Sequence, residues 1–249
     1  KLLPAGMVEK DYYITELLRE LSSMFPFLVF KGGTSLSKCY GAIERFSEDI
    51  DLSTDIAITQ GQRRQVKEKL FNTISQLGMA IVNAKDIRSR QNYNRYVIAY
   101  DSVLSPSALG STVIVEILYS ITAVPVDELP VQSMIGFYLQ KNNPLLAKDF
   151  LLSSFRMKNQ SLTRTFIDKV FALADYELRG ERNRQSRHIY DLYKLFSTTN
   201  SHCQKVETDQ KFKAFVYGRV LGDDLKIYTY SYEKNKIFII KMKTNISIR

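Results

Sequence analysis

The spacing of apolar residues changes along the chain, from a mixture of strand and helix periods in the first 160 residues to a helical period afterwards. One early helix is predicted by four apolar residues at helical spacing: Tyr13, Leu17, Leu18 and Leu21. A second helix is predicted in the same way by Val66, Leu70, Ile74 and Leu77. Runs of β-branched and aromatic residues predict strands over residues 27–30, 79–83, 96–101 and 112–120. Pro106, Ser107 and Gly110 separate the last two strands as a hairpin connection would.

Two further helices are predicted in the second part of the chain. The first carries an apolar stripe made of Phe166, Val170, Leu173, Ala174 and Leu178. Its start is placed near Thr165, because Asp168 three residues later completes the pattern of a capping box. The second carries Ile189, Leu192, Tyr193 and Phe196 on one face. We therefore expect an α/β domain over residues 1–160 and a mostly helical domain over residues 161–249, where Tyr228, Tyr230 and Tyr232 leave a strand, a frayed end or a helix open.

A pair of glycines follows the first predicted strand. Gly32 and Gly33 interrupt the apolar run, and glycines without Cβ allow backbone N–H groups to approach an anion closely. Thr34 and Ser35 add hydroxyl donors at the same place, just before a predicted helix. This turn is expected to hold a triphosphate, although a glycine pair alone is most often only a turn.

Two aspartates stand on the next predicted strand. In the sequence Asp49-Ile50-Asp51-Leu52, polar and apolar residues alternate, so both carboxylates leave one face of the strand. Two neighbouring carboxylates provide oxygen ligands for Mg²⁺, which completes its shell with water and substrate phosphates. Alone, such a pair is most often a solvated strand end. In the order strand, glycine turn, helix and aspartate strand, the two features together predict nucleotide chemistry.

Glu116 lies in the middle of the otherwise apolar strand at residues 112–120. A carboxylate is costly to bury unless it is paired or binds a metal. The residues themselves leave two interpretations open. Glu116 either points to solvent from a half-exposed strand, or it belongs to the aspartate site.

These segments resemble the polymerase-β-like nucleotidyltransferase signature, and more closely the AbiEii/AbiGii toxin-type nucleotidyltransferases of bacterial abortive infection and toxin–antitoxin systems. The resemblance covers about residues 9–195 and is carried by residues 9–12, 31–36, 45–47, 49–52, 164–166, 169, 187–188 and 190–192. It implies a mixed α/β (α+β) sheet with flanking helices, followed by a mostly helical domain. The spacing from the glycines to Asp49 is longer than in the general superfamily pattern and is normal for this family.

The resemblance also implies roles for individual residues. Asp49, Asp51 and Glu116 would be catalytic metal ligands in a two-metal arrangement, with Asp101 as the competitor of Glu116 for the third position. The nucleotide would be bound by Gly32, Gly33, Thr34, Ser35, Lys169, Arg187 and Asp191, with Lys31 or Lys38 as supplementary cations. Asp191 would orient Arg187 or His188 through a charge-assisted hydrogen bond. The implied cofactor is Mg²⁺ or Mn²⁺, and NTP is the substrate.

Charge and composition agree with a partner of opposite sign. The chain has 35 Lys plus Arg against 26 Asp plus Glu, a net charge of +9, which favours a polyanion such as RNA. The basic stretch at residues 85–96 is either an RNA-facing loop or a polar hairpin. The basic stretch at residues 179–187 is either a phosphate-binding rim for nucleotide or RNA or a solvated loop between helices. Cys39 and Cys203 form no motif typical of a zinc site or a disulfide framework. No apolar run reaches the roughly 18 to 20 residues of a membrane span, so we expect a cytoplasmic protein.

The sequence thus predicts an enzyme that moves a nucleoside monophosphate from NTP to an acceptor, in an Mg²⁺-dependent reaction. Given the resemblance, the acceptor is expected to be RNA, at a tRNA 3′ end, and the protein a toxin with a separately encoded antitoxin. Two alternatives stay open. The chain is a non-catalytic nucleotide- or RNA-binding module, or it transfers the nucleotide to a protein hydroxyl.

Overall fold

The structure is a computed structural model that describes residues 3–104, 110–181, 185–206, 228–233 and 236–242. The chain divides into two compact units, Lys1–Thr199 and Asn200–Arg249, which are described separately. Several features named above lie outside the described part: Pro106 and Ser107, residues 182–184 of the basic loop, the side chains of Leu178 and Cys203, and parts of the C-terminal tail.

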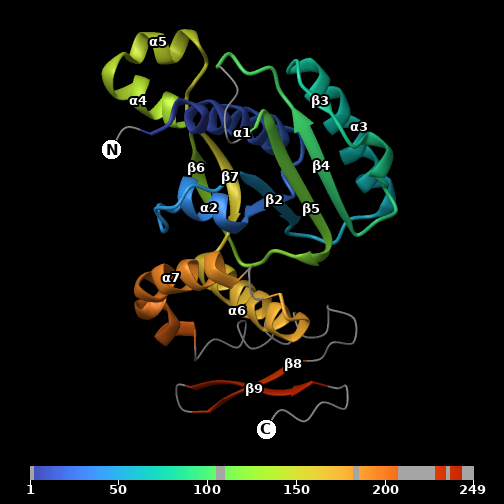
Figure 1. Cartoon of the computed structure of the whole chain (residues 1–249), viewed down its shortest axis with the longest axis vertical. Coiled ribbons are helices and arrows are strands. Elements are labelled where there is room, and N and C mark those ends of the chain that lie inside the picture. Colours follow the sequence, from blue (N-terminus) through green and yellow to red (C-terminus); the bar gives the residue numbers. More distant parts are fainter. Residues whose placement is uncertain (1–2, 105–109, 182–184, 207–227, 234–235, 243–249) are drawn as a thin grey trace. The chain divides into compact units, whose positions relative to one another are not determined.

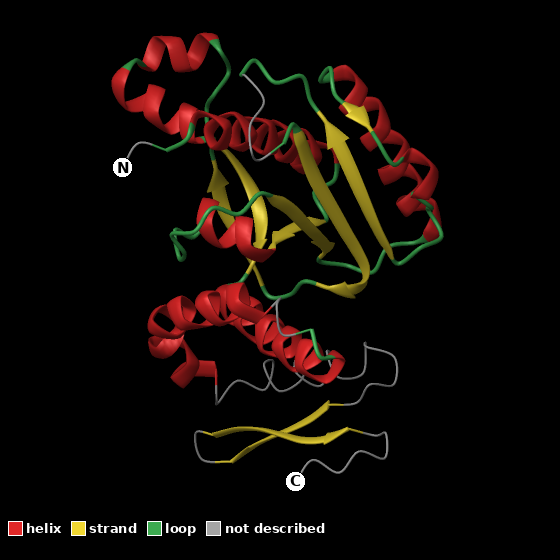
Figure 2. Cartoon of the chain, viewed as in Figure 1, coloured by secondary structure: helices red, strands yellow, loops and turns green. Residues whose placement is uncertain are grey.

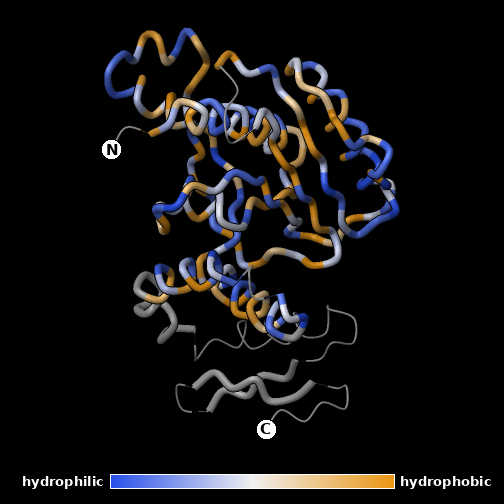
Figure 3. Tube along the Cα trace, in the orientation of Figure 1, coloured by the Kyte–Doolittle hydropathy of each residue, from blue (hydrophilic) through white to orange (hydrophobic). Residues whose placement is uncertain are grey.

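A mixed sheet forms the centre of the first unit, with the strand order β3-β4-β5-β2-β1-β7-β6 (Figure 1). The strands are β1 (Leu28–Lys31), β2 (Asp49–Thr54), β3 (Ala80–Ile81), β4 (Tyr93–Ala99), β5 (Thr112–Thr122), β6 (Val126–Val131) and β7 (Phe155–Gln160). Strand β2 runs parallel to β5, and β1 runs parallel to β7, while the other neighbours are antiparallel. Figure 3 shows the hydrophobic colour over most of β5, as expected for a central strand.

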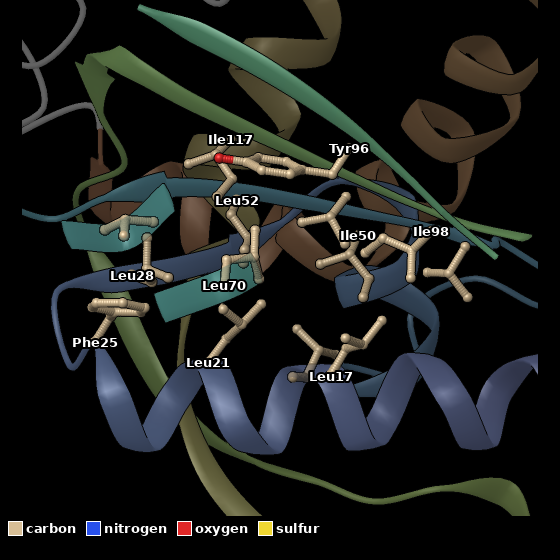
Figure 4. Packing of buried hydrophobic residues seen from close by; sticks show 14 of the residues in the cluster. Leu17, Leu21, Phe25, Leu28, Ile50, Leu52, Leu70, Tyr96, Ile98 and Ile117 are labelled. Atoms are coloured by element: carbon tan, nitrogen blue, oxygen red, sulfur yellow. The ribbon is translucent and has the colours of Figure 1, made fainter. Parts of the chain in front are cut away.

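The described helices are α1 (Ala5–Met24), α2 (Gly32–Lys38), α3 (Gln60–Gln76), α4 (Met134–Asn142), α5 (Pro144–Asp149), α6 (Leu162–Arg179) and α7 (Gln185–Val206), with a short 3₁₀ turn η1 (Ala84–Asp86). Of these, α1 packs along the sheet (Figure 2). In Figure 4, Leu17 and Leu21 of α1 point toward Ile50 and Leu52 of the sheet. All four side chains are fully buried. Burial of each such side chain contributes about 1.5 to 3 kcal/mol, so the predicted apolar stripe of α1 holds the helix on the sheet.

The mixed α/β class and the five predicted strands, including the aspartate strand, are confirmed, and β4 and β5 pair antiparallel as the hairpin signal predicts. The predicted start of α6 is wrong. The helix begins at Leu162, because the side chain of Ser161 accepts a hydrogen bond from the N–H of Arg164 and so caps the first turn. Strands β6 and β7 and helices α4 and α5 have no counterpart in the sequence prediction.

In the second unit, β8 (Tyr228–Glu233) and β9 (Lys236–Met242) form an antiparallel hairpin. Of the three possibilities left open for the tyrosine-rich segment, the structure shows a strand. Within the part of the chain that is described, no helix combines the length and the apolar character needed to cross a membrane.

Candidate active site

Four charged residues lie in one row across four neighbouring strands. Arg95 of β4 is in register with Glu116 of β5, Glu116 with Asp51 of β2, and Asp51 with Lys31 of β1. Residues in register across a sheet share a face, so these side chains leave the same side. Ile50 and Leu52 enter the core on the opposite side, as the alternation predicts. Two carboxylates therefore lie between two cations on one face of the sheet.

Both aspartates have raised pKa values. Burial raises the pKa of Asp51 to about 6, the charges of Glu116 and Asp49 add to this, and Lys31 and Lys169 act against it. The pKa of Asp49 is also raised, first by burial and then by the charges of Glu48 and Glu116. Among the described residues, no side chain donates a hydrogen bond to the carboxylate of Asp49 or Asp51. The pKa values of both aspartates stay raised although cations lie nearby, and a bound metal cation would stabilise their ionised forms.

The expected convergence of three carboxylates is not found. No three Asp, Glu, His or Cys side chains in the described residues lie together as a metal site. The Oε1 atom of Glu116 instead accepts a hydrogen bond from the hydroxyl of Tyr93 at 2.8 Å and lies 3.5 Å from Nε of Arg95. Asp49 and Asp51 alone still fit a magnesium ion, because Mg²⁺ is often held by one or two carboxylates plus substrate phosphates. Asp101, the competing acid, is exposed beyond the end of β4.

The glycine pair lies directly against this site. Gly32 has φ +77°, and a Cβ there would lie 2.0 Å from Oδ2 of Asp51. At Gly33 a Cβ would lie 2.5 Å from Nη2 of Arg45 and 2.7 Å from Oγ of Ser47. Both positions are therefore too crowded for a side chain. The first glycine allows the Asp51 carboxylate to approach the backbone, and the second allows a guanidinium to do so.

The two hydroxyls next to the glycines have internal partners. Thr34 is buried and donates to the carbonyl of Asp49 at 2.6 Å, and Ser35 is buried and donates to Oδ1 of Asn159 at 2.9 Å. Each hydroxyl proton is thereby used inside the protein. The expectation that both hydroxyls donate to a phosphate does not match this arrangement, because a hydroxyl has only one proton to give. In this turn, the main-chain N–H groups remain as hydrogen-bond donors for a phosphate.

Lys38 is also not a supplementary cation of the site. Its ammonium is buried and lies 2.5 Å from Oδ1 of Asp11, 2.9 Å from Oγ1 of Thr15 and 3.1 Å from the carbonyl of Gln132. The other carboxylate oxygen of Asp11 accepts the N–H of Met134, at the start of α4. Lys38 and Asp11 therefore fasten α2 and α4 to α1.

A buried cluster of three charges lies beside the glycine turn. Asp191 of α7 is 0% exposed and accepts hydrogen bonds from Nε and Nη2 of Arg45 at 2.8 and 2.7 Å, and from Nζ of Lys169 at 2.7 Å. Burial alone would raise the pKa of Asp191, but the hydrogen bonds from Arg45 and the charge of Lys169 outweigh it and lower that pKa. The cluster holds Arg45 against Gly33 and Lys169 near Asp51.

Asp191 was expected to orient Arg187 or His188, and the structure gives it Arg45 and Lys169 instead. Arg187 is exposed on the first turn of α7. Burial, followed by the charge of Lys169, lowers the pKa of His188 to about 4, so its imidazole is neutral at pH 7. Neither Arg187 nor His188 therefore provides the positive charge that pairs with the Asp191 carboxylate.

Sequence reasoning gave no role to Arg45. It appeared only within the resembling segment at residues 45–47, and its partner is 146 positions away. A signal was nevertheless present. Lys169 and Asp191 both lie off the apolar faces of their helices, and such off-stripe charges on two adjacent helices are candidates for a mutual pair.

Replacing Gly32 by alanine is expected to abolish activity, because the new Cβ would meet Oδ2 of Asp51 at 2.0 Å and displace that carboxylate. The matched control is Gly41→Ala. Gly41 also has a positive φ, +59°, but nothing lies within 4 Å of its Cβ position, so only the backbone strain of about 1 to 2 kcal/mol remains. Thermal unfolding and activity are measured for both variants. Equal loss of activity in both would contradict the assigned contact.

Comparisons with known proteins identify the family of this chain. The family described as "Nucleotidyl transferase AbiEii toxin, Type IV TA system" matches residues 16–226. No curated protein matches the chain significantly. One solved structure, described as "putative nucleotidyltransferase from H. pylori", is 15% identical, covers 85% of this chain and 88% of its own, and has a TM-score of 0.42. Since the family match spans most of the sequence, this chain belongs to the AbiEii nucleotidyl transferase toxin family of type IV toxin–antitoxin systems.

Proposed function

We propose that this nucleotidyltransferase moves a nucleoside monophosphate from NTP to an RNA acceptor in an Mg²⁺-dependent reaction, and that this acceptor is the 3′ end of tRNA. The observation that carries the proposal is the aspartate pair. Asp49 and Asp51 share one strand face, have raised pKa values and lie against a glycine turn. Such a pair suits a divalent cation with phosphate oxygens in its shell. Mn²⁺ provides the same coordination.

The triphosphate is proposed to lie on the glycine side of the carboxylates. The main chain of Gly32 and Gly33 would donate to phosphate oxygens, with Lys31 and the Arg45–Lys169 pair as the nearest cations. Arg45 and Lys169 are fixed by Asp191, so they offer positive charge without reorganising. Arg187, exposed on α7, is proposed to contact the nucleotide from the rim.

The reaction is proposed to be an in-line displacement at the α-phosphorus. The acceptor hydroxyl oxygen forms a bond to that phosphorus, and the bond from the phosphorus to the bridging oxygen of the β-phosphate breaks. The hydroxyl proton passes to a carboxylate, for which Glu116 is placed next in register to Asp51, and pyrophosphate leaves. A divalent cation held by Asp49 and Asp51 would supply charge neutralisation and lower the pKa of the hydroxyl.

We further propose the organisation and setting of this activity. Residues 1–160 would form the catalytic domain, and residues 161–249 a second domain that provides Lys169, Arg187 and Asp191. A type IV system implies a separately encoded antitoxin. The protein would act in the cytoplasm, where NTP and tRNA are present.

The function is tested by incubating the protein with each labelled NTP, Mg²⁺ and total RNA. We expect label on RNA, migrating with tRNA, and its loss in Asp49→Ala. Label on protein instead of RNA would support nucleotidyl transfer to a protein hydroxyl. RNA binding without any transfer would support a non-catalytic binding module. Either of these two results would overturn the proposal.

A further inference from the structure

We propose that strand β4 presents the acceptor-binding surface, and that a single-stranded RNA end crosses it to reach Glu116. The surface consists of Tyr93 and Arg95 on β4 and of Arg88 and Arg90 in the loop before it, and is called the β4 strip. This inference rests on the proposed function, because it names where the acceptor of the transfer binds. All four side chains are exposed.

The charged row across the sheet gives the direction of approach. Arg95, Glu116, Asp51 and Lys31 follow one another in register, with the glycine turn next to Lys31. Neighbouring strands lie about 4.8 Å apart, so Arg95 is about 10 Å from Asp51 on the side away from the glycines. Two anionic substrates must meet at the carboxylates. If the triphosphate lies on the side of Lys31, the acceptor has the side of Arg95, where β4 lies beside β5 (Figure 1).

Tyr93 has the features of a stacking platform beside the reaction. Its hydroxyl donates to Oε1 of Glu116 at 2.8 Å, which fixes the ring, while 44% of the residue remains exposed. Unpaired bases stack on exposed aromatic rings of this kind, and the interaction tolerates any base. A base stacked on Tyr93 would place the next nucleotide of the strand near Glu116.

The strip is strongly basic and is held in a defined conformation. Residues 85–95 contain four cations, Lys85, Arg88, Arg90 and Arg95, and one acid, Asp86. All five side chains are exposed. The buried side chain of Asn94 accepts the N–H of Arg88 and donates to its carbonyl, both at 3.0 Å. The loop that carries Arg88 is thus tied to β4. Exposed cations beside one aromatic ring match a polyanion with unpaired bases better than they match a protein segment.

The inference is tested with the double variant Arg88→Gln/Arg90→Gln, since neither residue touches a carboxylate of the site. Binding of a fluorescent single-stranded RNA is measured by anisotropy over a range of salt concentrations, together with KM and kcat for the transfer. We expect at least a tenfold weaker RNA affinity, a salt slope smaller by about 1.4 (about 0.7 for each lost phosphate contact), and unchanged kcat and KM for NTP. The matched control is Lys141→Gln/Lys148→Gln, which removes two exposed cations from α4 and α5.

Two substitutions of Tyr93 distinguish the stacking of its ring from the hydrogen bond of its hydroxyl to Glu116. We expect Tyr93→Phe to retain RNA affinity and lower kcat, whereas Tyr93→Leu loses about tenfold in RNA affinity as well. If the strip variants label RNA and bind it with wild-type affinity, the β4 strip is not the acceptor-binding surface, while the proposed function stays intact. An equal loss of affinity in the control would overturn the β4 strip too, as would labelling of protein with no RNA binding. If the wild type transfers no nucleotide, the proposed function fails, while the anisotropy measurements still show whether the β4 strip binds RNA.

Discussion

Replacing Asp51 by asparagine is expected to reduce nucleotidyl transfer by at least about 10³-fold, because charge neutralisation by a held cation is worth several kcal/mol in the transition state. The shape of the side chain is conserved and its charge is lost. A quenched assay with labelled NTP and RNA measures the rate. The matched control is Asp101→Asn, which removes one exposed acid beyond β4 and is expected to keep the wild-type rate.

The variant Asp51→Asn is expected to be more stable than the wild type when metal is removed. The pKa of Asp51 is raised from 3.8 to about 6, so the folded state binds this proton more tightly than the unfolded state does. The folded state therefore loses stability as the pH rises from about 4 to about 6, and at pH 7 the ionised carboxylate carries the full cost. Asparagine has no such cost, so we expect a free energy of unfolding higher by about 1 to 2 kcal/mol in EDTA at pH 7.

Urea unfolding with and without Mg²⁺ and a non-hydrolysable NTP measures this effect. Ligand should stabilise the wild type and leave Asp51→Asn nearly unchanged. An asparagine variant that is less stable than the wild type in EDTA, or equally stabilised by ligand, would contradict the role of Asp51.

Replacing Asp191 by alanine is expected to destabilise the protein by about 3 to 5 kcal/mol, since it leaves the buried Lys169 and the partly exposed Arg45 without their partner. Asp191 is fully buried and bound by both Arg45 and Lys169. Activity should also be lost, because these two cations are no longer held beside the glycine turn. The wild-type pKa of Asp191 is lowered, so its contribution is present above pH 3.8 and is lost as the pH falls through the folded value.

Urea unfolding of Asp191→Ala is compared with that of Asp175→Ala. Asp175 pairs with Arg179 one turn away on α6 in a partly exposed ion pair, and such a pair is worth about 0 to 1 kcal/mol. Adding Lys169→Met to Asp191→Ala removes one uncompensated cation and should recover part of the loss. Similar unfolding energies for the two aspartate variants would show that the buried cluster is not a stabilising unit.

The face of the sheet that carries the aspartates was predictable, because the period of two in a strand determines which side chains share a side. Strands β6 and β7 were not predictable in this way. β6 carries Asp127, Glu128 and Pro130, and β7 reads Phe-Arg-Met-Lys-Asn-Gln, so neither has an apolar run. They form through tertiary contacts, such as the pairing of β7 with β1 and the hydrogen bond from Ser35 to Asn159.

The partners of the charged site residues depended on contacts far apart in sequence. No local pattern indicates that Arg45 meets Asp191, or that Tyr93 and Arg95 hold Glu116. The expected donors Thr34 and Ser35 failed for a related reason. Their hydroxyls find acceptors in β2 and β7, and the sequence of the turn gives no information on those strands.

The account depends on the aspartate pair as the place where a divalent cation and the triphosphate meet. The most direct test is anomalous diffraction from crystals grown with Mn²⁺ and a non-hydrolysable NTP. We predict a manganese peak within coordination distance of carboxylate oxygens of both Asp49 and Asp51, with the triphosphate beside Gly32 and Gly33. Bound nucleotide with the metal elsewhere, or with no metal at these two carboxylates, would contradict the account.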